Sequence, residues 1–186
     1  MNIHENVEKR AAHALSLLVR QFSFPLSQQD RLTYRSGDEA GSKWGIRYTR
    51  AKKWISRVYK PEITYMFALP DTADETYRLS WNPGKKQWKS TEDHGSRLIG
   101  RLNEHRDITQ LLASVDMEKV ELFKNGNEVT LTLIPIPGCF IWTLIPPIHY
   151  FVRIKPEEAA VITDVALRIE HAVLHDESAM KKAPAI

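Results

Sequence analysis

The apolar stretch from Val129 to Ile154 constrains the fold of this chain more than any other feature. It is long enough to cross a membrane as a single helix. Prolines and a glycine divide it into short pieces, however, at Pro135, Pro137, Gly138, Pro146 and Pro147. Pieces of this length that end at proline and glycine are typical of β-strands and turns. The stretch therefore predicts strands, and we expect no membrane span.

A hairpin signal comes just before this stretch. Asn125-Gly126 suits the positive φ that a type I′ turn requires, and it separates the expected strands Lys119–Lys124 and Asn127–Ile136. Pro137-Gly138 and Pro146-Pro147 predict two more chain reversals, which gives a four-stranded antiparallel meander. Both faces of the third strand, which begins at Cys139, are apolar, so we expect both faces to be covered.

Apolar periodicity predicts helices at the N-terminus, in the middle and near the C-terminus. The first carries a stripe at Val7, Ala11, Leu15, Leu18 and Phe22. Gly95 to Val115 fits one or two helices, with Asp107 as the N-cap of the second, and the last helix begins at Pro156. Further strands are expected at Leu32–Ser36, Trp44–Thr49 and Ile63–Leu69, and a hairpin at Thr76–Ser90 that turns at Asn82-Pro83-Gly84, with a loop at Asp38–Ser42.

These elements predict an α+β fold. The antiparallel sheet would combine the C-terminal four-stranded meander with the N-terminal strands and pack against the N-terminal, middle and C-terminal helices. No linker divides the chain, so we expect one domain over residues 1–175 and a frayed tail at 176–186. With 42% hydrophobic and 26% charged residues, the composition is close to that of globular proteins.

Two observations bear on the compartment. Cys139 is the only cysteine, which rules out an intrachain disulfide and fits a reducing environment. Glu5 and Glu8 occupy the part of the N-terminus that a secretory signal would make positive. We therefore expect a cytoplasmic protein.

The segment from Lys43 to Lys60, called the basic segment below, is the clearest clue to a binding surface. It holds seven Lys or Arg residues, four Trp or Tyr residues and no carboxylate, although the net charge of the whole chain is only +3. Cations neutralise phosphates and flat rings stack on bases, so this composition suits a nucleic acid or another acidic partner. The residues expected to bind such a polyanion are Lys43, Arg47, Arg50, Lys52, Lys53, Trp54, Arg57, Tyr59 and Lys60. The alternative is two strands, or a strand and a short helix before Pro61, whose rings belong to the core.

A second candidate surface lies in the apolar meander. Its large side chains could line a ligand pocket or a homodimer face, with a histidine as polar contact. The residues concerned are Phe140, Trp142, Leu144, His149 and Tyr150. The alternative is ordinary packing of these rings against the terminal helices.

Other residues with reactive side chains have simpler explanations. His171 and His175 are four apart on the last helix, the spacing of two metal ligands, but Asp164 and Arg168 place them on a solvated stripe. The group His94, Glu104, His105 and Asp107 offers acid–base chemistry, yet it also fits a turn that leads into a helix.

Motifs of common enzymes are missing from the sequence. It contains no GxxxxGK[ST], GxGxxG or GxSxG motif and no paired cysteines. We therefore expect no catalytic residues, metal or cofactor. The expectation is a non-enzymatic binding protein that contacts either a polyanion through the basic segment, or an apolar ligand or subunit partner through the meander.

Overall fold

The computed structural model describes residues 3–37, 43–52, 55–69, 75–90 and 96–181. The predicted α+β fold is confirmed. The described residues form an antiparallel sheet and the helices α1 (Ile3–Val19), α2 (Ser96–Glu104), α3 (Arg106–Ser114) and α4 (Pro156–Lys181). The strands are β1 (Ser27–Asp30), β2 (Thr33–Arg35), β3 (Lys43–Lys52), β4 (Ser56–Ala68), β5 (Thr76–Asn82), β6 (Gln87–Ser90), β7 (Met117–Asn125), β8 (Glu128–Pro135), β9 (Phe140–Thr143) and β10 (His149–Phe151).

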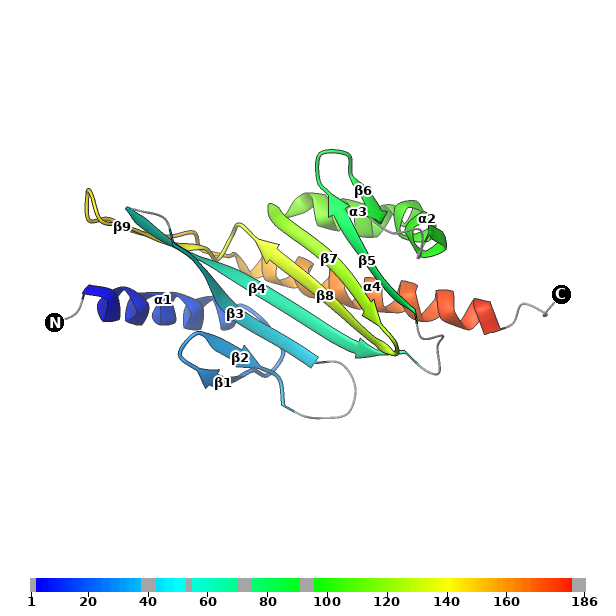
Figure 1. The fold of residues 1–186 in the computed structure, drawn as a ribbon, viewed down its shortest axis with the longest axis horizontal. Helices are drawn as coiled ribbons and strands as arrows, with labels where there is room; N and C mark the ends of the chain where they lie inside the picture. The colour runs from blue at the N-terminus through cyan, green and yellow to red at the C-terminus, as the bar shows by residue number, and fades with distance from the viewer. Residues whose placement is uncertain (1–2, 38–42, 53–54, 70–74, 91–95, 182–186) are drawn as a thin grey trace.

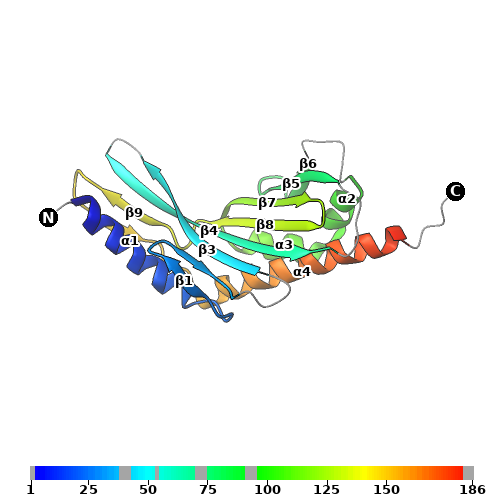
Figure 2. The same cartoon turned by 60° about the horizontal axis from the view of Figure 1, so that its bottom comes forward.

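The sheet is covered by helices on one face (Figures 1 and 2). Its strand order is β1-β2-β3-β4-β8-β7-β5-β6, and the β9–β10 hairpin joins it through β4. Buried and partly exposed residues alternate along β4, β5 and β8, as expected when only one face packs on a core. The molecule is elongated, and α1 and α4 follow each other along the same face.

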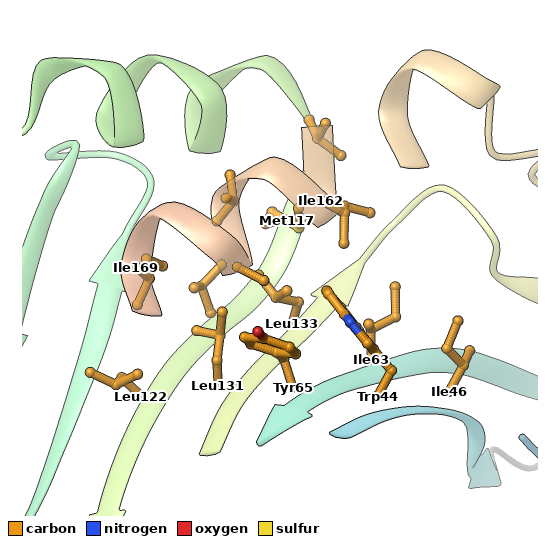
Figure 3. Packing of buried hydrophobic residues seen from close by; sticks show 14 of the residues in the cluster. Trp44, Ile46, Ile63, Tyr65, Met117, Leu122, Leu131, Leu133, Ile162 and Ile169 are labelled. Atoms are coloured by element: carbon orange, nitrogen blue, oxygen red, sulfur yellow. The ribbon is translucent and has the colours of Figure 1, made fainter. Parts of the chain in front are cut away.

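The core lies between the sheet and the helices, and Figure 3 shows the part next to α4. Ile162 and Ile169 of α4 are completely buried, as are Ile63 and Leu131 of the sheet. The helix that apolar periodicity predicts near the C-terminus is thus confirmed, with its apolar side on the sheet. One polar contact adds to this packing, since the Tyr65 hydroxyl donates a 2.6 Å hydrogen bond to the Glu170 carboxylate.

Strand β4 is the centre of the sheet and pairs with three other strands. One edge pairs with β3 along the whole length of that strand. The other edge pairs first with β9, where Tyr59 faces Phe140, and then with β8, where Ile63 faces Leu133. Strands β8 and β9 therefore run in the same direction along one edge of β4.

This arrangement corrects the predicted meander. The chain does not reverse at Pro137-Gly138, and β8 does not pair with β9. Instead, the segment between Leu133 and Phe140 is longer than the part of β4 around Pro61 that lies between their partners, Ile63 and Tyr59. Its extra residues bulge out of the sheet, and Gly138 permits the bend with a φ of +96°. The reversal predicted at Pro146-Pro147 is confirmed, because β9 and β10 form a hairpin.

Smaller differences concern the ends of elements. Asn125 pairs with Glu128, so the turn between β7 and β8 consists of Gly126 and Asn127. Of these two residues only Gly126 has a positive φ, which fits a type II′ turn and not the predicted type I′. His105 is the N-cap of α3, and Asp107 lies within its first turn.

Helix α4 begins at Pro156, as predicted, and continues to Lys181 instead of ending near His175. Residues 182–186 of the expected tail and the expected loop Asp38–Ser42 lie outside the described residues. In the part of the chain that the structure describes, no helix combines the length and apolar character needed to span a membrane.

Candidate functional site

The basic segment forms the β3–β4 hairpin, which settles the choice between strand and helix. Side chains alternate between the faces of a strand, so the cations of the segment are divided. Arg47 and Lys60 point to the face without helices, where Arg47 contacts Glu62 at 2.7 Å and Lys60 contacts Glu118. Arg50 and Arg57 point to the helix-covered face. The described cations therefore do not form one continuous surface.

The rings of the basic segment are mostly inaccessible. Trp44, Tyr48 and Tyr59 are buried, and Tyr59 has no exposed surface. Stacking on a base would require an exposed ring, which none of these three provides. Lys53 and Trp54 lie outside the described residues, as does the side chain of Lys52, while Lys43 and Arg50 are exposed.

The residues of the second candidate surface belong to the β9–β10 hairpin and have different environments. Phe140 is buried with its ring 5.9 Å from that of Tyr59, and Trp142 lies 6.0 Å from the guanidinium of Arg57. Leu144 and Tyr150, by contrast, are exposed. The expectation that both faces of this strand are covered is therefore wrong near its end, because helices pack on only one face and Leu144 lies beyond the start of β4.

A pocket of about 510 Å³ lies between α1 and the β9–β10 hairpin. Its apolar wall consists of Ala14 and Leu17 from α1 together with Phe140 and Phe151 from the strands. Its polar lining consists of Lys9, Arg10, His13 and His149. The helix contributes residues spaced three or four apart, which lie on one side of a helix.

Arg10 and His149 meet across this pocket. The Arg10 guanidinium donates a 2.9 Å hydrogen bond to Nδ1 of His149. Because a guanidinium can only donate, Nδ1 of His149 is the acceptor in this contact. Both side chains are exposed, so they remain accessible to a ligand at the rim.

The electrostatic character of the pocket is positive. None of the eight described residues that line it is acidic. Lys9 is paired with Glu5 at 3.0 Å, an exposed contact that partly offsets its charge. Arg10 is thus the principal positive group at the rim, next to an apolar wall.

Sequence reasoning found the strand side of this pocket but not the helix side. Phe140 and His149 were among the predicted residues, whereas Arg10 and His13 were not. The spacing of Arg10, His13 and Leu17 places them beside the predicted apolar stripe of α1. Nothing local in the sequence shows that this side of the helix faces a hairpin more than a hundred residues away.

The other reactive groups do not assemble a site. The Nε2 atoms of His171 and His175 are 3.0 Å apart, but no group of three metal-ligating side chains exists among the described residues. Asp107 accepts a 2.6 Å hydrogen bond from Arg168 of α4. Partial burial raises the pKa of Asp107, but hydrogen bonds from Arg168 and the Ile108 backbone outweigh this and lower it overall, so Asp107 joins two helices as an anion. His94 lies outside the described residues.

Comparison with protein families gives one match, over residues 19–173. The chain belongs to the DUF3156 family. The description of the DUF3156 family is that of proteins of unknown function. No curated protein and no solved structure matches the chain. The region shared with DUF3156 includes the strand side of the pocket and begins just after the α1 residues that line it.

Proposed function

We propose that this DUF3156 protein is a carrier that binds a small amphipathic anion in the pocket between α1 and the β9–β10 hairpin. The observation that supports it is the combination of an apolar wall with Arg10 at the rim. An acyl chain or another apolar body would lie on Phe140, Phe151 and Leu17. A carboxylate or comparable acidic group would contact the guanidinium.

The size and lining of the pocket support the apolar part of this ligand. A volume of about 510 Å³ falls within the range of sites for small molecules, which are mostly apolar with a few polar groups. Phe140 is fixed by its packing on Tyr59, so part of the wall is preformed. A preformed wall reduces the entropy lost on binding.

The contact between Arg10 and His149 supports the acidic part. One nitrogen of the guanidinium is directed by Nδ1 of His149, and the group has further N–H donors for a ligand. Guanidinium and carboxylate groups match in geometry and form charge-assisted hydrogen bonds. Because none of the described lining residues is acidic, an anion would meet no direct repulsion from them.

The alternative, binding of a nucleic acid by the basic segment, has weaker support. Arg47 and Lys60 contact carboxylates, and the rings of Tyr48 and Tyr59 are buried. Displacing these contacts would reduce the gain from phosphate binding. A pocket with a matched polar group needs no such rearrangement.

The test is displacement of 11-(dansylamino)undecanoic acid, a fluorescent fatty acid, followed by its emission. Decanoate should displace it well and decanol, which lacks the charge, on the order of tenfold less well. Arg10→Met should weaken binding of the probe on the order of tenfold and reduce the preference for decanoate. Arg20→Met changes an exposed arginine of the same region that does not line the pocket, and it should bind normally.

Two results would contradict the proposal. One is equal displacement by decanoate and decanol. The other is unchanged binding in the Arg10→Met variant, with circular dichroism confirming that both arginine variants are folded. Salt-sensitive binding of fluorescent single-stranded DNA or RNA that persists in this variant would support the basic segment instead.

A further inference from the structure

The β3–β4 and β9–β10 hairpins project at one end of the molecule (Figures 1 and 2). Five large apolar side chains among the described residues of these hairpins are exposed. Ile145 is the most exposed, at 73%, and Tyr150 follows at 62%. Ile55 joins the others because its carbonyl accepts a 2.9 Å hydrogen bond from the Leu144 amide. We call this group the apolar tip: Ile55, Leu144, Ile145, Ile148 and Tyr150.

The tip is held in this exposed position by its own hydrogen bonds. The Thr143 amide donates to the Ile148 carbonyl at 2.9 Å, and the Thr143 hydroxyl donates to the Pro146 carbonyl at 2.7 Å. The Ile148 amide donates to the same Pro146 carbonyl at 2.8 Å. The fold therefore presents these side chains to the outside in a compact turn, and exposing them without a partner is unfavourable.

The two chain segments that carry the tip are basic. The sequence contains no Asp or Glu from Lys43 to Pro61 or from Ile136 to Lys155. Arg50 is exposed on β3, which leads to this end, and Arg10 lies on the adjoining pocket rim. Exposed apolar groups next to cations match the surface of an anionic membrane, where each cation near the lipid is favourable.

We propose that the apolar tip inserts into an anionic membrane surface. Ile145 and Ile148 would enter the outer acyl region, and Tyr150 would lie at the headgroup level, where its ring and hydroxyl are both satisfied. A second copy of the chain fits less well. A projecting turn with five apolar side chains offers little area compared with the roughly 1,200 Å² or more that a specific interface buries.

The pocket lies next to the tip, which relates membrane insertion to ligand binding. His149 lies between Ile148 and Tyr150 in sequence, so the rim of the pocket adjoins the tip. An inserted tip would bring Arg10 and the apolar wall close to the lipid from which an amphipathic anion could be drawn. This part of the inference depends on the proposed function, whereas membrane insertion itself does not.

Co-sedimentation with vesicles tests the inference. The full chain should bind vesicles of phosphatidylcholine with about one third phosphatidylglycerol, and bind pure phosphatidylcholine vesicles much less. The double variant Ile145→Glu with Ile148→Glu should require on the order of tenfold more lipid for half-maximal binding. Leu167→Glu is the matched control, because Leu167 is an exposed apolar residue of α4 outside the tip, and it should bind normally.

The two proposals can fail separately. The tip variant should still bind dansylaminoundecanoic acid in the absence of vesicles. Arg10→Met keeps the tip and should still sediment with anionic vesicles, with at most about fivefold more lipid for half-maximal binding, because it lacks one cation. Membrane insertion would be rejected if the wild-type chain did not bind anionic vesicles or if the tip variant bound as the wild type does. It would also be rejected if sedimentation velocity showed a dimer that the tip variant dissociates, since the tip would then be a subunit interface.

Discussion

The Tyr48 hydroxyl donates a 2.5 Å hydrogen bond to the carbonyl oxygen of Gly138. The bond joins β3 to the bend between β8 and β9, and it is buried. Burial, with a smaller contribution from Cys139, raises the pKa of Tyr48, so the hydroxyl remains a donor throughout the usual pH range.

Replacing this donor should destabilise the fold. Tyr48→Phe removes the hydroxyl and leaves the Gly138 carbonyl without it, which should lower the free energy of unfolding by about 1–3 kcal/mol. Urea denaturation followed by circular dichroism measures this change. Tyr150→Phe, which alters an exposed tyrosine, should change stability little, and a similar loss in both variants would contradict the role of the buried bond.

Gly138 should not tolerate a side chain. Its φ of +96° strains any other residue, and an added Cβ would overlap the Leu18 side chain and lie 3.2 Å from Pro61. We expect Gly138→Ala to lower the free energy of unfolding by about 2–4 kcal/mol. Gly100→Ala is the control, since Gly100 lies in α2 and an added Cβ there would have no atom within 4 Å, and it should stabilise the protein by up to about 1 kcal/mol. Equal stability of the two variants would refute this account of the bend.

The Cys139 thiol should make stability depend on pH in the alkaline range. Burial raises its pKa to about 11, Glu118 adds to this increase and Lys60 opposes it. In the unfolded chain the thiol ionises near the ordinary cysteine pKa of 9.0, so the free energy of unfolding should fall as pH rises from about 9 towards 11.

Cys139→Ala should remove this part of the pH dependence, because it removes the titrating group. Urea denaturation of both proteins at a series of pH values measures it. Parallel stability curves would contradict the shift. In the native protein near neutral pH, the thiol should also react slowly with Ellman's reagent, and rapidly once the chain is unfolded.

Asn103 of α2 protects the edge strand β6. Its side-chain oxygen accepts a 2.7 Å hydrogen bond from the Trp88 amide, and its side-chain nitrogen donates to the Trp88 carbonyl at 3.3 Å. Asn103→Ala should lower the free energy of unfolding by about 1–3 kcal/mol and increase light scattering on storage, because an uncovered edge can pair with other chains. Gln87→Ala changes an exposed residue of the same strand and should do neither.

The elements that the sequence predicted correctly are those with local signals. The hairpin after Lys124, the turn at Pro146-Pro147 and the start of α4 at Pro156 depend on residues next to one another. The pairing of β9 with β4 has no such local signal, because it depends on the bend at Gly138 that places the extra residues between β8 and β9 outside the sheet. Pro137 and Gly138 predicted a reversal of the chain. In the structure the chain only bends there, and Gly138 contacts Tyr48 and Leu18 at the bend.

The candidate site illustrates the same limit. The division of Arg47 and Arg50 between two faces follows from strand geometry once the segment is known to be a strand. The contact between Arg10 and His149 joins residues 139 positions apart, and neither residue has a local signal that predicts the other. The pocket could therefore be found only from the folded chain.

Strand β4 pairs with β3, β8 and β9 and so connects the hairpin beside the pocket to the rest of the sheet. If the β9–β10 hairpin were removed or detached, the backbone groups of Ser56 to Tyr59 that now pair with β9 would become an open edge. Such an edge accepts strands from other molecules, which is the first step of domain swapping and fibril growth. The hairpin that carries the apolar tip thus also covers this edge of β4 and prevents each molecule from polymerising with its neighbours through it.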